Sequence, residues 1–92
     1  MIVSFRHRGL KRLYERGDRS RVSPQLVDQA EDILGLLDLA KDPEDMDLPG
    51  YRLHRLRGNL RGFWSITVSG NWRIVFRFDG GNALDIDLID YH

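Results

Sequence analysis

The sequence has no cysteine and no long apolar run, and these two absences exclude several classes of protein and of functional site. Without cysteine it has no disulfide, no thiol nucleophile and none of the commonest ligands of structural zinc. Its three histidines are spaced too irregularly to suggest a metal site. No run of about 18 apolar residues is present, and the first residues lack the apolar core of a secretory signal. We therefore expect a cytoplasmic protein that binds no membrane, no metal and no other cofactor.

Charge is balanced overall but unevenly distributed along the chain. The 92 residues are 41% hydrophobic and 30% charged, and we expect a single domain spanning residues 1–92. Residues 51–78 carry six arginines and no acidic residue, whereas residues 22–50 carry eight acidic residues and one lysine. A basic region of this kind can neutralise phosphates although the whole chain has zero net charge. Alternatively these blocks are only solvated faces, since a block in sequence need not be a patch in space.

Two helices are predicted in the first half of the chain. One begins at about Arg8 and ends at Gly17, a residue suited to the left-handed position after a helix. Ser23 and Pro24 are typical of the start of a second, longer helix. Its apolar residues recur at helical spacing and should pack on a sheet. They are Leu26, Ala30, Ile33, Leu34 and Leu37, and the outer face carries Asp28, Glu31, Asp32 and Asp38.

Strands are predicted at the start and throughout the second half. Ile2, Val3 and Phe5 indicate a short opening strand, and another is expected over about Tyr51 to Leu56. Between them, residues 42–50 contain two prolines and a glycine and should form a loop with one helical turn. A hairpin turning at Gly70 and Asn71 and a last strand from Ala83 to Ile89, with Leu84, Ile86 and Leu88 facing inward, complete the set.

The predicted fold is α+β, with an N-terminal strand and two helices packed on one face of an antiparallel sheet. In the hairpin, apolar and polar residues alternate, so one face builds the core and the other stays largely open. Trp64, Trp72, Ile74 and Phe76 are expected to be buried against the helix residues Ile33, Leu34 and Leu37. The open face should carry Ser65, Thr67, Arg73, Val75 and Arg77.

Residues suited to cutting RNA gather in three places: His54 with Arg57, Arg73 with Arg77, and residues 90–92. Metal-free cleavage needs a base near the ribose 2′-hydroxyl, an acid near the leaving 5′-oxygen, and a cation beside the phosphate. Histidine suits the first two roles because its pKa is about 6.5, and the arginine fork grips phosphate oxygens.

Each of these residues also has an ordinary structural reading. In this alternative interpretation, His54 is only a surface histidine on a strand, and Arg73 forms an ion pair with Asp85 or Asp87 across the sheet. Tyr91 covers the core, and His92 is a frayed end. The combination favours chemistry, because strands can bring all three groups to one face of a sheet.

Four segments, in the same order and nearly end to end, resemble a known family. They are Ile2-Val3-Ser4-Phe5-Arg6-His7-Arg8-Gly9-Leu10-Lys11, Arg52-Leu53-His54-Arg55-Leu56-Arg57-Gly58, Trp64-Ser65-Ile66-Thr67-Val68 with Asn71-Trp72-Arg73-Ile74, and Asp90-Tyr91-His92. The chain is similar to the HigB-type (host inhibition of growth) toxins of bacterial type II toxin-antitoxin modules, within the RelE/ParE superfamily. The resemblance implies a compact RelE-like domain that enters the ribosomal A site and cuts messenger RNA there. It also implies a helix-turn-helix antitoxin of the HigA type, through which alone the complex binds operator DNA.

The resemblance also implies roles for individual residues. His54, Asp90, Tyr91 and His92 form the proton-transfer cluster, and Arg73 holds the scissile phosphate. In this scheme His54 or Tyr91 is the base and His92 is the acid. Side chains alternate between the two faces of a strand, so Tyr91 and His92 can serve one site only if the backbone leaves strand geometry near Asp90. Arg57 stands where relatives often have lysine, and it keeps only a role in binding phosphate or ribosomal RNA. A further RNA contact is expected from Arg77. The basic residues of the first helix should face ribosomal RNA; they are Arg8, Lys11, Arg12 and Arg16.

Two alternatives belong to other functional classes. A ParE-like toxin that acts on DNA gyrase would share the fold without needing proton-transfer residues, so His54 with Tyr91 and His92 speaks against it. A non-catalytic interaction domain would bind a partner through the acidic face of the second helix. Growth arrest on expression of this chain alone, and a neighbouring reading frame that encodes a small helix-turn-helix protein, would test whether the chain is a toxin with a cognate antitoxin.

Overall fold

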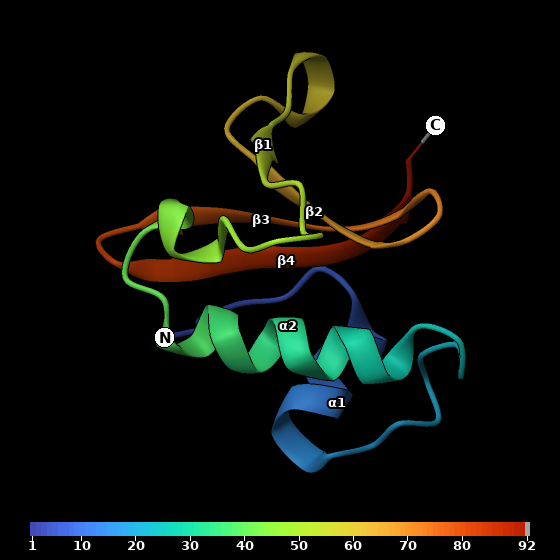
Figure 1. The fold of residues 1–92 in the computed structure, drawn as a ribbon. Helices are drawn as coiled ribbons and strands as arrows, with labels where there is room; N and C mark the ends of the chain where they lie inside the picture. The colour runs from blue at the N-terminus through green and yellow to red at the C-terminus, as the bar shows by residue number, and fades with distance from the viewer. Residues whose placement is uncertain (92) are drawn as a thin grey trace.

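The computed structural model describes residues 1–91, and it places two helices on one face of a four-stranded antiparallel sheet (Figure 1). The sheet order is β1-β2-β3-β4, and the α+β class predicted from the sequence is confirmed. No helix in this range is both long and apolar enough to cross a membrane. The elements are α1 (Arg8–Arg16), α2 (Val27–Leu39), η1 (Pro43–Met46), β1 (His54–Arg55), η2 (Gly58–Leu60), β2 (Trp64–Ser69), β3 (Trp72–Asp79) and β4 (Asn82–Asp90).

Helix α1 has the predicted bounds, and both of its ends are capped. The His7 ring accepts a hydrogen bond from the Leu10 amide at 3.1 Å, which satisfies one free N–H of the first turn. Gly17 has φ 68°, and its amide donates to the carbonyls of Arg12 and Leu13. The sequence predicted the glycine cap, whereas histidine is not among the residues commonly found at a helix start.

Helix α2 begins later than predicted, at Val27 rather than next to Ser23. The carbonyl of Ser23 accepts from the amides of Leu26 and Val27, so the chain makes a turn before the helix is established. Leu26 occupies the capping position and provides no side-chain hydrogen bond. The predicted inward stripe is confirmed, because all of its members are buried: Leu26, Ala30, Ile33, Leu34 and Leu37.

The predicted N-terminal strand is reduced to two isolated bridges. Ile2 pairs with Ala83 and Phe5 with Ile86, both in parallel orientation. Between the bridges, the Ser4 hydroxyl accepts from the Asp85 amide at 2.8 Å. This side-chain bond takes the backbone donor that a continuous ladder would use, so the segment lies along β4 without forming a regular strand.

Strand β1 is shorter than predicted: the expected strand from Tyr51 to Leu56 contains only His54–Arg55. Gly50 and Arg52 have φ values of 85° and 52°, which are incompatible with a pleated strand. The amides of Thr67 and Leu56 still form hydrogen bonds, to the carbonyls of Tyr51 and Phe63 respectively, so the segment follows the edge of β2 irregularly.

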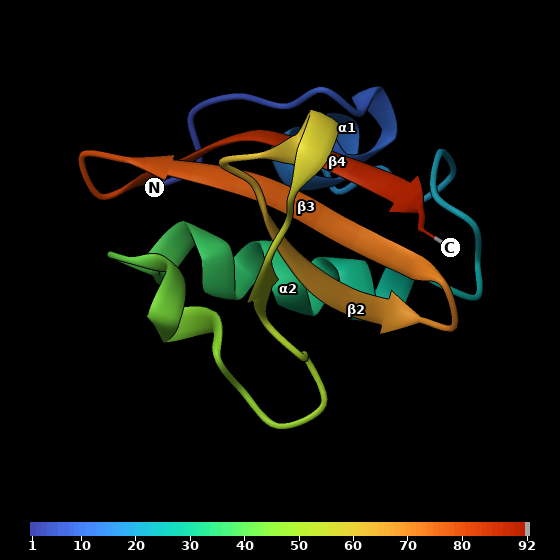
Figure 2. The same ribbon diagram turned by 90° about the horizontal axis from the view of Figure 1, so that it is seen from above.

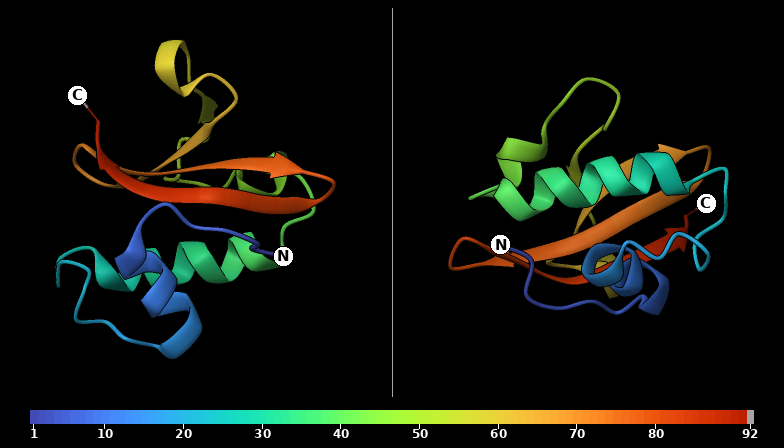
Figure 3. Two further views of the ribbon diagram at one scale, coloured as in Figure 1. Left: turned by 180° about the vertical axis from the view of Figure 1, so that it is seen from behind. Right: turned by 90° about the horizontal axis from the view of Figure 1, so that it is seen from below.

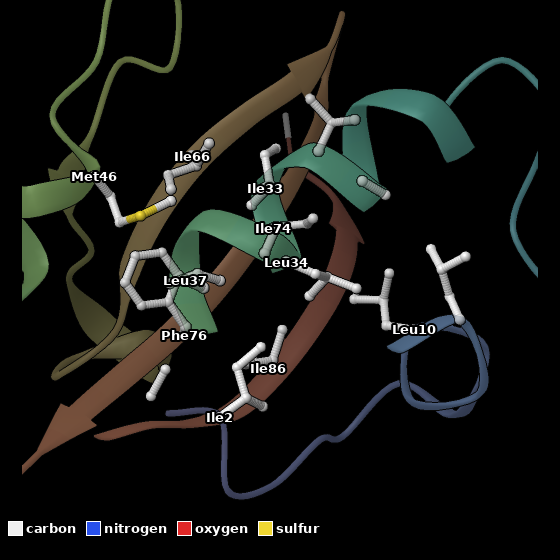
Figure 4. Close-up of a cluster of buried hydrophobic side chains, with 14 of the residues drawn as sticks. Ile2, Leu10, Ile33, Leu34, Leu37, Met46, Ile66, Ile74, Phe76 and Ile86 are labelled. Atoms are coloured by element: carbon white, nitrogen blue, oxygen red, sulfur yellow. The ribbon is translucent and has the colours of Figure 1, made fainter. Parts of the chain in front are cut away.

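The core lies between the sheet and α2 (Figure 4). Ile74 and Phe76 are fully buried there, as predicted, together with Ile66, and Trp64 is half-buried. Trp72 was predicted to be buried, and that prediction is wrong: its side chain is 38% exposed. It stands at the hairpin end of β3, where its cross-strand partners are Ser69 and Asp90, both exposed.

In β4 the predicted inward alternation fails at its start. Asp85 has φ 53°, and the register with β3 shifts between Val75 and Arg77. This bulge changes the phase of the strand, so Ala83 and Ile86 are fully buried although they are three positions apart. Leu84, predicted to face inward, is therefore only half-buried outside the core cluster.

The face of the sheet away from the helices is partly covered rather than open. The segment that contains β1 and η2 crosses over it (Figure 2). It forms a small second cluster in which Leu56, Phe63 and Val75 are buried. Ser65, predicted to lie on an open polar face, is fully buried for the same reason.

Asp38 connects the N-terminal segment to both helices, and its replacement with alanine is expected to cost about 1–3 kcal/mol. Its Oδ1 accepts from the Ile2 amide at 3.0 Å and the Tyr14 hydroxyl at 2.8 Å. These bonds, the amide first, lower the Asp38 pKa. A lowered pKa gives stability that is present above the unfolded-state value and is lost as pH falls through the folded-state value.

Urea unfolding at neutral pH and at a pH below the Asp38 pKa measures this effect. The difference between wild type and Asp38→Ala should be full at neutral pH and should shrink in acid. Asp32→Ala, an exposed position on the same helix, is the matched control and should change stability little. A difference independent of pH would show that the carboxylate charge contributes nothing.

Candidate functional site

Strand register places His54 and Arg73 on the same face of the sheet, the one away from the helices. His54 is paired with Ser65, which is paired with Val75; one row further, Thr67 is paired with Arg73. Directly paired residues share a face. The two Cα atoms are two strands and two residues apart, which gives roughly 12 Å from standard sheet spacings. They do not touch, so a substrate would have to lie between them.

The end of β4 lies next to Arg73. Arg73 pairs with Ile89, and β4 ends one residue later at Asp90. The Tyr91 amide donates to the Asn71 carbonyl at 2.8 Å, and the Tyr91 side chain is exposed. The end of β4 turns toward the side of the sheet that carries β1 and η2 (Figure 3). The remaining predicted member of this group, His92, lies outside the described residues.

Arg73 is half-buried, and its fork is held at one end only. Its Nη1 donates to the carbonyls of Gly70 at 2.6 Å and Trp72 at 3.2 Å. Its Nε is buried without a hydrogen-bond partner among residues 1–91. The predicted alternative, an ion pair with Asp85 or Asp87, is wrong for Arg73, because no carboxylate of the described chain lies within ion-pair distance of it. Within residues 1–91, no acidic side chain therefore neutralises its charge.

His54 is exposed, and one hydrogen bond fixes the roles of its two ring nitrogens. Nδ1 lies 2.9 Å from the Arg52 carbonyl oxygen. A carbonyl only accepts, so Nδ1 must carry the proton and Nε2 of the neutral ring is left as an acceptor. This tautomer suits a base that takes a proton at Nε2.

Arg77 and Arg57 differ in how much of their charge is free. Arg77 donates to Asp85 at 3.1 Å and also lies beside the Phe63 ring, so Asp85 partly neutralises it. Arg57 is exposed immediately before η2 and has no ion pair among the described residues. Of these two predicted RNA contacts, Arg57 keeps the stronger electrostatic case.

The sequence matches a known family over almost its whole length. The family described as RelE-like toxin of type II toxin-antitoxin system HigB matches residues 3–92. The chain belongs to this HigB toxin family. It is 46% identical to Endoribonuclease HigB of Proteus vulgaris over 92 residues, covering all of both chains. It is 34% identical to Toxin HigB-1 of Vibrio cholerae serotype O1 over 87 residues, which is 92% of each chain.

Solved structures share the fold at low sequence identity. A chain of the heterotetrameric YoeB-YefM toxin-antitoxin complex of Staphylococcus aureus gives a TM-score of 0.61 at 17% identity, covering 100% of this chain and 98% of that one. The YoeB dimer of Staphylococcus aureus gives 0.61 at 18% identity, with 100% and 97% covered. At this identity the likeness shows the fold, which is that of a RelE-like toxin.

In this HigB-family chain the basic residues Arg8, Lys11, Arg12 and Arg16 form a ridge on α1. Helix α1 lies on the opposite side of the sheet from β1 (Figure 1). A shallow groove of about 330 Å³ runs along it, with Glu15 among its lining residues. Arg19 does not extend the ridge, because it pairs with Asp28 and, at 2.6 Å, with Glu31. The ridge therefore consists of the four predicted residues Arg8, Lys11, Arg12 and Arg16.

Two features of the site were not predicted from the sequence. Ser65 Oγ and Thr67 Oγ1 are buried without a hydrogen-bond partner among residues 1–91, on the same face as Arg73. Arg55 and Arg61 line a cleft beside β1. The arginine-rich, acid-free composition of residues 51–78 was the available signal for the cleft. Among the described residues, no three His, Asp or Glu side chains are grouped to hold a metal ion.

Proposed function

We propose that this HigB-family chain is the toxin of a toxin-antitoxin module and cuts messenger RNA in the ribosomal A site. The observation that carries the proposal is Arg73, a cation with no carboxylate partner in the described structure, with His54 across the same face and Tyr91 near its strand. The relative at 46% identity is an endoribonuclease by name, which favours nuclease activity over gyrase poisoning.

In the proposed reaction the ribose 2′-oxygen attacks the adjacent phosphorus. His54 Nε2 or the Tyr91 oxygen takes the 2′-hydroxyl proton, and Arg73 stabilises the charge that accumulates on the phosphate oxygens. The bond to the 5′-oxygen breaks, and His92 gives that oxygen a proton. Asp90 holds a neighbouring group in one orientation. The products are a 2′,3′-cyclic phosphate and a free 5′-hydroxyl.

The ribosome supplies the orientation that this small face lacks. His54 and Tyr91 are exposed, and within residues 1–91 neither of them lines the grooves beside β1, along α1 or on the outer face of α2. Holding a substrate in the reactive geometry can lower the reaction barrier by roughly 7–11 kcal/mol. In the cytoplasm, the decoding centre of the ribosome would hold the messenger in this way. The ridge on α1 would contact ribosomal RNA from the other side. Messenger on 70S ribosomes should therefore be cut, and free RNA should survive.

A messenger carrying a single 2′-deoxy nucleotide at the scissile position is expected to resist cleavage completely. The attacking oxygen belongs to the ribose, so removing it removes the nucleophile. Programmed ribosomes, purified protein and end-labelled messenger provide the assay, and the unmodified product should carry a 2′,3′-cyclic phosphate. Placing the deoxy nucleotide one position away is the control. Cleavage of the deoxy messenger at the unmodified rate would rule out this mechanism.

A cognate antitoxin of the helix-turn-helix HigA type is the proposed partner, and operator DNA is bound only through it. The outer face of α2 supports docking away from the site: Leu36 and Leu39 are exposed there and, together with Glu31 and Asp32, line a groove of about 510 Å³. An antitoxin seated there would block ribosome entry. Protection of Arg73 from modification in the complex, without protection along α1 and α2, would instead indicate direct masking.

A further inference from the structure

Residues 51–62, which we call the arm, carry positive charge that nothing in the described structure neutralises. The arm stands on the side of the sheet away from α1 and α2 (Figure 1). The ion pairs within residues 1–91 involve only Arg19 and Arg77 among the arginines, so none forms in the arm. Exposed cations without partners are free to bind phosphates. The arm has four of them, all exposed: Arg52, Arg55, Arg57 and Arg61.

Two of these arginines form the walls of a cleft between the arm and β2. Its volume is about 260 Å³, and Trp64 and Phe63 contribute apolar lining. The Arg55 guanidinium carbon lies 4.8 Å from the centre of the Trp64 ring, a cation–π contact that orders the side chain. Arg61 is the second cationic wall. Gly62, at φ 91°, leaves the space beside it open.

The size and chemistry of the cleft select a flat ligand with a negative charge. It is far larger than the roughly 30 Å³ occupied by one water, yet slightly below the roughly 300–1,000 Å³ typical of small-molecule sites. Guanidinium planes stack on nucleobases, and guanidinium forks grip phosphates. We propose that this cleft binds one nucleotide of single-stranded RNA, with its base on Arg55 and its phosphate on Arg61.

The position of the cleft indicates which RNA the nucleotide belongs to, and this step rests on the proposed function. His54 and Arg55 are consecutive in β1, so they point to opposite faces of the edge strand. An RNA strand leaving Arg73 and His54 over this edge arrives directly at the cleft. The bound nucleotide therefore belongs to the messenger and flanks the scissile bond.

The salt dependence of RNA binding tests the cleft without requiring cleavage. The purified chain is titrated into a labelled single-stranded RNA that carries 2′-deoxy at the scissile position, over a series of salt concentrations. R55Q/R61Q removes one phosphate contact, at Arg61, and the guanidinium on which the base stacks, at Arg55. It should therefore reduce the slope of log affinity against log salt by about 0.7, and affinity should fall roughly tenfold. R21Q/K41Q removes the same charge from exposed positions outside the arm and should keep the wild-type slope. Equal slopes for wild type and R55Q/R61Q would overturn the proposal.

A conservative variant separates stacking from charge. R55K keeps the cation but loses the planar group, so it should retain the wild-type salt slope and bind several-fold more weakly. Thermal melting of each variant checks that the fold is intact. R55K binding as tightly as wild type would overturn the assignment of the base to Arg55.

Crosslinking on programmed ribosomes distinguishes messenger from ribosomal RNA. A 4-thiouridine next to the cut codon should crosslink to the arm in wild type and not in R55Q/R61Q. Crosslinks from the arm to ribosomal RNA alone would overturn the messenger assignment. If wild type shows the salt effect on free RNA but never cuts ribosome-bound messenger, the proposed function fails and the cleft remains an RNA site.

Discussion

Replacing Arg73 with alanine is expected to slow messenger cleavage on programmed ribosomes by about 100-fold or more. Arg73 has no carboxylate partner among residues 1–91, so no acidic side chain in that part of the chain offsets the charge that would stabilise the phosphate. The hairpin carbonyls of Gly70 and Trp72 hold its Nη1, which presets the fork before substrate arrives. A preorganised donor of this kind typically contributes about 2.7–4 kcal/mol to the transition state.

Arg77→Ala is the control for this prediction. Arg77 lies on the same strand, but Asp85 already partly neutralises it, so its loss should slow cleavage much less. Single-turnover rates at saturating protein report the chemical step, and melting temperatures verify folding. Equal losses for the two variants would show that Arg73 contributes only general positive charge. A wild-type rate for Arg73→Ala would remove it from the mechanism.

The helices were predictable because their signals are local. The buried stripe from Leu26 to Leu37 follows directly from helical spacing, and Gly17 ends α1 as its conformational freedom suggests. The phase of β4 was not predictable in the same way. A bulge at Asp85 depends on a hydrogen bond with Ser4, which is 81 positions away in sequence. Alternation alone therefore assigned Leu84 to the core in place of Ala83.

The candidate catalytic residues could be predicted from their residue type, whereas their arrangement in space depends on how the strands pair. His54 reaches the same face as Arg73 only because β1 pairs with Ser65 in one particular register. A two-residue edge strand carries too little alternation to fix that register from sequence. For the same reason the cover over Ser65 and the cleft beside Arg55 were missed, since both depend on how the arm folds back.

Phe76→Ala is expected to lower the free energy of unfolding by about 3–5 kcal/mol. Phe76 is fully buried and belongs to the same cluster as Leu37 and Met46 (Figure 4). Its ring packs edge to face with that of Phe78, and the two ring centroids are 5.8 Å apart. Neither the sheet nor α2 can close over the missing ring without moving, so most of the space should remain as a cavity. Small domains have only about 5–15 kcal/mol in total, so the loss would be severe.

Trp72→Ala is the matched comparison, because it removes a larger ring from the other end of the same strand. At 38% exposure, outside the core cluster, that ring should contribute much less, about 1 kcal/mol or below. Urea unfolding measures both variants, and an unchanged m-value would show that the midpoint shift reports stability alone. If Trp72→Ala lost as much as Phe76→Ala, the hairpin end of β3 would have to be buried in solution, against the exposure of its partners Ser69 and Asp90.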